Sequence, residues 1–138
     1  MSIPASLQEI IDAFRAAPKP LRLPLLLEYA EKLPPLPPGM EGSLERVHEC
    51  QTPLFLRATT DAEGRVSLAF DAPKEAPTTR GFAAVVQAGL QGRSVDEVLA
   101  VPDDFYADMG LTELISPLRL RGMGAIVARV KRQLRDPG

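Results

Sequence analysis

The chain has 138 residues, of which 45% are hydrophobic and 25% charged, as in folded soluble proteins rather than disordered ones. This length fits one hydrophobic core, and we expect a single domain over residues 1–138. The formal net charge is -2, so the chain lacks the overall positive charge that nucleic-acid-binding domains usually have. The C-terminal part is nevertheless basic, because six basic residues and only one acidic residue follow Leu118.

The sequence carries no targeting or membrane signal that we recognise. Its first residues, Met-Ser-Ile-Pro-Ala-Ser, lack the basic and apolar segments of a secretory signal, and no apolar run approaches the roughly 20 residues of a membrane span. Cys50 is the single cysteine, so no disulfide can form within the chain. We therefore expect a cytoplasmic protein that does not associate with membranes.

Two helices are predicted in the N-terminal part. Ser6 and Glu9 have the spacing of a capping box, and Pro18 follows that helix. Pro24 suits the first turn of the second helix. The apolar faces of the two helices comprise Leu7, Ile10, Ile11 and Phe14, then Leu25, Leu26, Tyr29 and Leu33. Residues 33–39 are rich in proline, which has no backbone N–H to donate, so we expect a stiff connector there.

The middle of the chain predicts strands and the rest predicts helices. Residues 54–59 and 66–70 alternate between apolar and polar around a turn at 61–64, which indicates a hairpin, and residues 44–48 are a weaker third strand. Four helices are expected in the rest of the chain. The first covers residues 82–90, the second starts at the capping box of Ser94 and Glu97, and the third covers residues 103–109 before Gly110. The last starts at Ser116, and its apolar face comprises Met123, Ile126, Val127, Val130 and Leu134. The expected fold is α+β, a small antiparallel sheet of about three strands covered by helices.

Few residues carry chemistry. His48 is the single histidine, no serine-nucleophile motif supports a catalytic triad, and no glycine-rich phosphate loop follows a strand. A zinc site would have to use the consecutive residues His48, Glu49 and Cys50, whose spacing suits joint coordination poorly, and an iron–sulfur cluster normally needs four thiolates. We therefore expect no metal and no cofactor bound by this chain alone.

Cys50 is the remaining reactive group. It lies between the proline-rich connector and a strand, in a loop or at a strand edge, and its neighbours Glu49, Gln51 and Thr52 are polar. A thiol that reacts as thiolate needs access to solvent or to a partner. The alternative is a small buried apolar side chain, which is how most free cysteines behave. A nearby Glu49 carboxylate would also disfavour the thiolate.

Four sequence blocks resemble the SufE family. Residues 47–56, Val-His-Glu-Cys-Gln-Thr-Pro-Leu-Phe-Leu, resemble the family's cysteine loop V-x-G-C-Q-S-x-V-W-L. Residues 33–37 are similar to its L-P-x-L-P connector, and residues 80–82, Arg-Gly-Phe, stand where the family has K-G-L. The segment 105–123 resembles its F-x-x-L-G-L…L-S-P-x-R-x-x-G-L/M pattern. The order and separation of the blocks identify the chain as a member of this family.

The resemblance implies a function in sulfur transfer. Family members accept sulfur from a pyridoxal-phosphate-dependent cysteine desulfurase (SufS-like), stimulate that enzyme, and hand the sulfur to an iron–sulfur cluster scaffold (SufBCD-like). By this resemblance Cys50 becomes a persulfide, pyridoxal phosphate belongs to the partner, and the chain is not an enzyme by itself. The fold implied is that of SufE and the related IscU-type scaffolds, with the cysteine loop sheltered until the partner draws it out.

The resemblance also nominates residues around Cys50. Gln51 and Thr52 match the family's Gln-Ser and are expected to fix the loop by hydrogen bonds, unless they reflect ordinary polarity at a strand start. Arg119 matches the arginine of S-P-x-R, and a cation in the first turn of a helix is not explained by local stability. It is expected near the loop or facing the desulfurase, the alternative being a solvated side chain. His48 and Glu49 are expected to support the loop or bind the partner.

One residue of the Cys50 segment departs from the family pattern, and the sequence leaves three other functions open. Glu49 replaces the family's glycine, so a loop that needs a left-handed backbone there would be built differently. Cys50 could be structural in a non-catalytic interaction domain. The basic segment 129–135 could bind nucleic acid, although cations near a helix C-terminus are favourable anyway. A stand-alone thiol oxidoreductase would lack a second, resolving cysteine.

Overall fold

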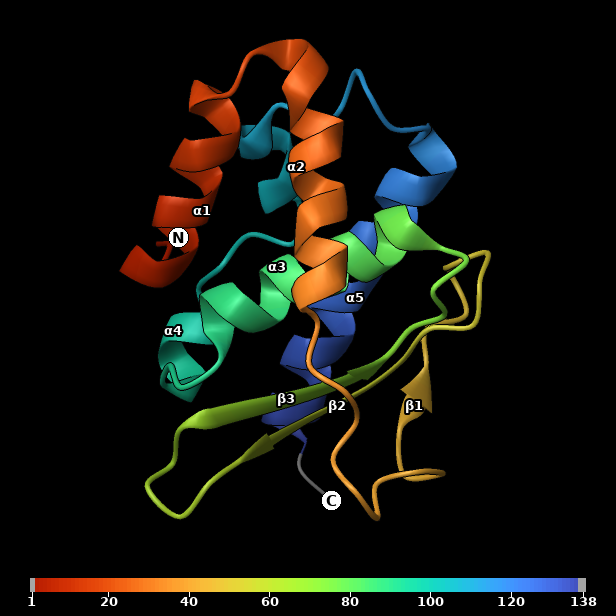
Figure 1. The fold of residues 1–138 in the computed structure, drawn as a ribbon. Helices are drawn as coiled ribbons and strands as arrows, with labels where there is room; N and C mark the ends of the chain where they lie inside the picture. The colour runs from red at the N-terminus through yellow and green to blue at the C-terminus, as the bar shows by residue number, and fades with distance from the viewer. Residues whose placement is uncertain (1, 137–138) are drawn as a thin grey trace.

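The computed structural model describes residues 2–136 and confirms the α+β class (Figure 1). A three-stranded antiparallel sheet is covered by helices, as the strand and helix patterns predicted. In chain order the elements are α1 (Ala5–Ala16), α2 (Lys19–Lys32), β1 (Glu45–Arg46), β2 (Phe55–Thr60), β3 (Val66–Asp71), α3 (Pro77–Leu90), α4 (Val95–Leu99), the 3-10 helix η1 (Phe105–Met109) and α5 (Pro117–Arg135).

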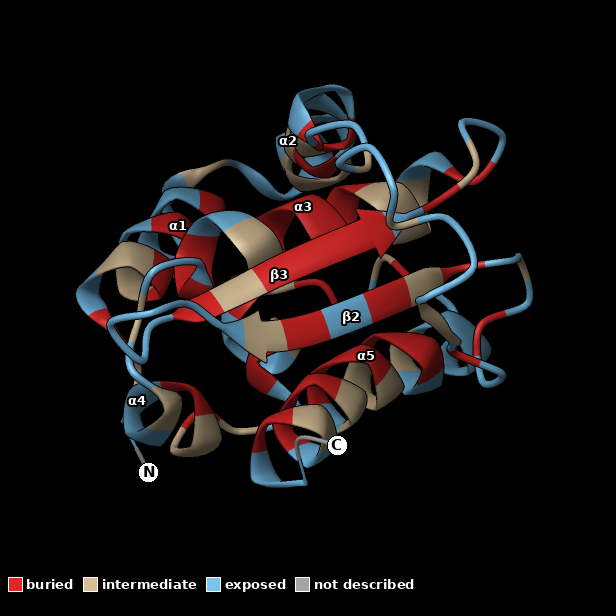
Figure 2. Cartoon of the chain, turned by 90° about the horizontal axis from the view of Figure 1, so that it is seen from below, coloured by how far each residue is buried: buried red, intermediate tan, exposed pale blue. Residues whose placement is uncertain are grey.

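The sheet has the order β1-β2-β3, and its register follows the predicted hairpin. Leu56 pairs with Phe70 and Ala58 with Leu68, and all four side chains are buried while Arg57 between them is exposed. α5 runs alongside β2, and buried residues concentrate in β3, in α3 and in the turns of α5 beside the strand (Figure 2). The alternation of apolar residues therefore places one face of the hairpin on the core.

Helix α3 lies at the centre of the packing, because α1, α2, α5 and β3 all contact it. Gly81 allows the close approach of α2, since a Cβ at this position would collide with the carbonyl group of Leu26. Phe82 is fully buried and stacks on Phe105 of η1 with 5.3 Å between the ring centroids. The remaining core residues include Leu7, Ile11 and Phe14 of α1 and Ile126, Val127 and Val130 of α5, as predicted.

Both predicted helix starts in the N-terminal part are wrong, and α3 begins at Pro77 rather than at residue 82. α1 begins at Ala5 after Pro4, so Ser6 lies inside the helix and forms no cap; its hydroxyl instead donates to the carbonyl of Gly89 at 2.6 Å. α2 begins at Lys19, where Pro20 occupies the first turn, and Pro24 lies inside the helix. The capping box of Ser94 and Glu97 and the cap of α5 by Ser116 are both present, because those serines directly precede the first helical residue.

The first strand and the helix before Gly110 are shorter than predicted. β1 comprises only Glu45 and Arg46 instead of residues 44–48, because the chain turns away from the sheet after Val47. The helix expected over 103–109 is the 3-10 helix Phe105–Met109, and Gly110 ends it in the left-handed region at φ +71°. Residues 33–39 form neither helix nor strand, as expected of the proline-rich connector. Within the described residues, no helix has the length and apolar character required to span a membrane.

Candidate functional site

The segment that joins β1 to β2, residues 48–53, carries Cys50 and is called the Cys50 loop below. The N–H of Val47 donates to the carbonyl of Leu54 at 2.8 Å and closes the base of the loop. The N–H of Cys50 donates to the carbonyl of Val47 at 3.1 Å, which turns the chain so that the cysteine side chain lies inward. Only 8% of Cys50 is exposed, although its neighbours in sequence are polar. The loop is thus a tight turn that buries its thiol.

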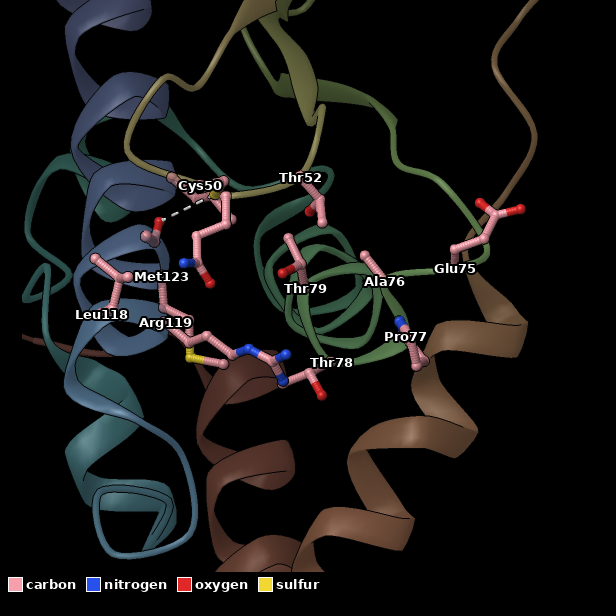
Figure 3. Close-up of a pocket in the computed structure, with 13 residues that line it drawn as sticks. Cys50, Thr52, Glu75, Ala76, Pro77, Thr78, Thr79, Leu118, Arg119 and Met123 are labelled. Atoms are coloured by element: carbon pink, nitrogen blue, oxygen red, sulfur yellow. Dashed lines mark hydrogen bonds between the residues drawn. The ribbon is translucent and has the colours of Figure 1, made fainter.

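The thiol rests on the second turn of α5. Its Sγ donates a hydrogen bond to the carbonyl of Gly122 over 3.8 Å, drawn as a dashed line in Figure 3. A Cβ at position 122 would lie 3.1 Å from that Sγ and 3.5 Å from the carbonyl oxygen of Glu49. A glycine at 122 therefore lets the loop close on the helix, which gives this position a packing role.

A cavity of about 220 Å³ opens beside the thiol, between the Cys50 loop, the first turn of α3 and the first turns of α5 (Figure 3). Arg119 extends from α5 toward the first turn of α3, where Thr78 and Thr79 line the same space. Thr52 lines this cavity, and its buried hydroxyl has no hydrogen-bond partner in the part of the chain that the structure describes. One water molecule occupies roughly 30 Å³ in the liquid, so the cavity has room for an atom added to Cys50.

The surroundings keep Cys50 protonated. Burial raises the pKa of the Cys50 thiol to about 11, with a smaller contribution from the carboxylate of Glu49, while the guanidinium of Arg129 acts in the opposite direction. At neutral pH the closed loop therefore holds a neutral thiol, which is a poor nucleophile. Reaction at this sulfur requires the loop to open or a partner to change the charges around it.

Glu49 is held on the outside of the loop by α5. Its Oε1 accepts hydrogen bonds from Nη2 of Arg129 at 2.8 Å and from Nε at 3.2 Å. Arg129 also bonds to Glu45 of β1. The hydrogen bonds from Arg129 lower the pKa of the Glu49 carboxyl, so it is ionised at neutral pH. None of the described residues other than glycine has a positive φ, so the loop accommodates Glu49 without a left-handed backbone.

The structure brings together four of the six nominated residues. Cys50, Gln51, Thr52 and Arg119 line the same cavity. The other two, His48 and Glu49, are exposed on the loop and do not line it. Within residues 2–136, Gln51 and Thr52 make no side-chain hydrogen bond that fixes the loop, and the connection between β1 and β2 is instead closed by backbone bonds.

Sequence reasoning missed Arg129 as a neighbour of the Cys50 loop. The arginine was assigned only to a basic segment, and the carboxylate that it binds lies 80 positions earlier in the chain. The available signal was its spacing of seven residues from Gly122, which places both positions on one face of α5 about two turns apart. Thr78 and Thr79 were also missed, because no motif marks them.

The basic C-terminal segment is largely engaged within the chain. Arg129 and Arg132 both bond to Glu45, and Lys131 pairs with Asp103 at 2.7 Å. These pairs leave less positive charge for a phosphate backbone than the sequence suggests. Across residues 2–136 there is no group of three or more His, Cys, Asp or Glu side chains arranged to hold a metal ion.

Comparisons with known proteins agree with the fold and the sequence blocks. The SufE family, described as an Fe-S metabolism associated domain, matches residues 8–134. Uncharacterized SufE-like proteins of Mycobacterium tuberculosis strains CDC 1551 and H37Rv are 52% identical over 136 residues, which is 98% of this chain and 95% of each relative. SufE-like protein 1 of Arabidopsis thaliana, chloroplastic/mitochondrial, is 32% identical over 88% of this chain and 32% of its own length.

A solved structure supports the same relationship. The solution structure of a hypothetical protein from Thermus thermophilus superposes with a TM-score of 0.88 at 48% identity, and the match covers 97% of this chain and 96% of that one. The family match extends over nearly all of the sequence and includes the Cys50 loop and the cavity-lining turns of α3 and α5. The chain therefore belongs to the SufE family, which is associated with iron–sulfur metabolism.

Proposed function

We propose that the chain accepts sulfur on Cys50 from the persulfide of a pyridoxal-phosphate-dependent cysteine desulfurase and passes it to an iron–sulfur cluster scaffold. The observation that carries this proposal is the placement of the single cysteine on a loop beside a cavity of about 220 Å³ that has an arginine in its wall. A sulfur carrier needs a thiol that can be reached by a partner and space that shelters the added sulfur afterwards.

The transfer is a thiol–persulfide exchange. With the loop open, the Cys50 thiol loses its proton and the thiolate attacks the terminal sulfur of the partner's Cys–S–SH. The sulfur–sulfur bond of the partner breaks, its cysteine leaves as a thiolate and takes up a proton, and Cys50 becomes Cys–S–SH. No electron acceptor is required, because one persulfide replaces another. Transfer frees the desulfurase cysteine for the next turnover, so we expect the chain to stimulate that enzyme.

The cavity beside Cys50 supports this proposal, because it offers space for a persulfide when the loop closes. Arg119 and Thr52 line the same cavity as Cys50, and the Thr52 hydroxyl has no hydrogen-bond partner among the described residues. A persulfide is more acidic than a thiol, so a cation and a hydroxyl in the wall of the cavity would favour its anion if they reach the added sulfur. The chain itself needs no cofactor for the exchange, and pyridoxal phosphate belongs to the desulfurase. We place the exchange in the cytoplasm, where free thiols are kept reduced.

Intact-protein mass spectrometry tests the proposal. The chain is incubated with a cysteine desulfurase of the same organism and cysteine, without reductant, and Cys50→Ser is treated in parallel. We expect the wild type alone to gain the mass of one sulfur atom, and we expect faster sulfide release by the desulfurase when reductant and wild-type chain are present. With a desulfurase that is active on its own, an unchanged mass and unchanged turnover would show that Cys50 is a structural cysteine.

A further inference from the structure

We propose that Arg129 is a positioning residue that holds the Cys50 loop closed, so that a partner gains access to Cys50 by separating Arg129 from Glu49. The importance of this step for sulfur transfer rests on the proposed function, whereas the closure of the loop is a property of the chain alone. The bridge from Glu45 through Arg129 to Glu49 is called the Arg129 bridge below.

The geometry of the Arg129 bridge is suited to holding the Cys50 loop against α5. Nε, Nη1 and Nη2 of Arg129 are all engaged, two of them by Glu49 and one by Glu45. Glu45 is fixed by its place in the sheet, where it pairs with Leu56, and by a further bond from Arg132. The planar guanidinium is thereby held in one orientation before Glu49 binds, which reduces the entropy lost on closing the loop.

The bridge acts on the residue next to the thiol. Glu49 precedes Cys50 directly, so closing the bridge carries the cysteine onto α5, where Sγ meets the carbonyl of Gly122. That second contact is weak, because a thiol is a poor donor and the two atoms are 3.8 Å apart. The Glu49 and Arg129 side chains are 42% and 20% exposed, so solvent ions and a charged partner both reach the bridge.

Access to Cys50 follows from this arrangement. In the closed loop the thiol is buried and protonated, so a reagent attacks it only in the fraction of molecules whose loop is open. The observed rate is then the open fraction multiplied by the rate of the free thiol. Any change that weakens the Arg129 bridge raises the open fraction and with it the rate.

Loop opening and direct electrostatics predict opposite effects of removing Arg129. If the thiol reacted within the closed loop, loss of the neighbouring cation would raise the pKa of Cys50 and slow the reaction. If Arg129 holds the loop closed, its loss speeds the reaction. Glu49→Gln does not separate the two explanations, since removing the carboxylate accelerates the reaction in both. Arg129→Gln is therefore the decisive variant.

The experiment follows alkylation of the isolated chain by iodoacetamide, a neutral reagent whose approach is not steered by charge. At low salt we expect Arg129→Gln to react roughly 2- to 5-fold faster than the wild type, as the loss of one partly exposed ion pair between the loop and α5 predicts. Glu49→Gln is expected to accelerate similarly, and the double variant to exceed neither single variant by much, because both remove the same contact. Added salt should accelerate the wild type and leave Arg129→Gln nearly unchanged.

The matched control is Arg132→Gln, which removes the same charge one turn further along α5. Arg132 bonds to Glu45 and no bond from it to the Cys50 loop is found among the described residues, so its removal loosens only the anchor of the bridge, and we expect a much smaller acceleration than for Arg129→Gln. The alkylation rate of each variant unfolded in urea gives the reactivity of its free thiol, and the rates of the folded variants are divided by it. Urea unfolding curves show how much of any increase in the alkylation rate comes from global unfolding. A slower or unchanged rate for Arg129→Gln, or equal acceleration by Arg132→Gln, would overturn the proposal. No desulfurase is used, so this outcome is independent of the sulfur-uptake test.

Discussion

At the scale of single residues, the titration of Cys50 couples the thiol to the stability of the fold. The unfolded chain loses the thiol proton near pH 8.5, whereas the folded chain retains it up to about pH 11. Between these values the unfolded state binds fewer protons, so the free energy of unfolding falls as pH rises, and below about pH 8.5 the thiol has no such effect.

We therefore expect the wild type to lose stability relative to Cys50→Ser as pH rises from about 8.5 to 11. The loss is at most about 1.4 kcal/mol for each pH unit, because one proton is involved. Urea unfolding of both proteins at several pH values in this window measures the difference, and the serine variant subtracts the titration of all other groups. A difference that stays constant across the window would show that the folded thiol titrates as in an unfolded chain.

Sequence could identify single residues only where their chemistry or a motif marked them. Cys50 is conspicuous as the one cysteine, and Arg119 as a cation that helix stability does not explain. Arg129 has no such mark, because a basic residue toward the C-terminal end of a helix is favourable on its own. Ser6 shows the converse error: its spacing to Glu9 fits a capping box, but its hydroxyl is used by Gly89 across the fold.

At the scale of elements, the fit of the Cys50 loop on α5 depends on the absence of a side chain at Gly122. Alanine is a better helix former than glycine by up to about 1 kcal/mol, so Gly122→Ala favours α5 taken alone. Its Cβ would, however, lie only 3.1 Å from Sγ of Cys50, so the thiol or the loop that carries it must shift by a few tenths of an ångström. We expect the close contact with Sγ to offset the gain in helix stability, and we expect the alkylation of Cys50 to be faster than in the wild type.

Gly124→Ala is the matched control, since Gly124 lies two residues further along the same helix. A Cβ there meets its nearest neighbours in Asp103 and Tyr106 at 3.9 Å, which is ordinary contact. We expect this variant to gain stability in urea unfolding and to keep the wild-type alkylation rate. Equal rates for Gly122→Ala and Gly124→Ala would mean that the loop does not depend on close contact with α5.

Elements with a regular period were predictable and irregular ones were not. α1, α3, α5 and the β2–β3 hairpin follow their apolar periodicity, since burial of one face decides both the element and its orientation. The start of α2 was missed because Pro24 was taken as a first-turn residue, whereas the helix tolerates the loss of one hydrogen bond inside. β1 has only two residues, so an alternation of apolar and polar side chains cannot show in its sequence. It is a strand because it pairs with β2, which is a contact that the local sequence does not reveal.

At the scale of the whole molecule, two arginines tie the N-terminal helices to each other and to α3. Arg22 donates to the carbonyls of Phe14 and Ala17 at the end of α1, at 3.0 and 3.1 Å. Arg80, in the first turn of α3, donates to the carbonyl of Ala30 at the end of α2. Both cations thus satisfy carbonyl groups that a helix end leaves free. The bonds of Arg80 and the core packing of Gly81 and Phe82 give residues 80–82, the Arg-Gly-Phe block, a structural role that needs no sulfur chemistry.

Arg80 joins three parts of the chain, and its replacement tests this role. Its Nε bonds to Ala30 of α2 at 3.0 Å and its Nη1 to Ala72, just after β3, at 2.6 Å. Arg80→Met keeps most of the apolar stem but leaves both carbonyls without a donor, so we expect a loss of about 1–3 kcal/mol in the free energy of unfolding. Arg80→Lys keeps the charge but has one donor head instead of a planar fork, so its loss should be intermediate.

Arg57→Met provides the comparison, because Arg57 lies on the exposed side of β2 and its loss should stay within about 0.5 kcal/mol. Urea unfolding with an unchanged denaturant dependence measures all three variants. Equal losses at positions 57 and 80 would mean that the bonds of Arg80 contribute no more than a surface charge. A loss confined to position 80 would mean that α2 is fastened to α3 and to the end of β3 through one side chain, independently of the Cys50 loop.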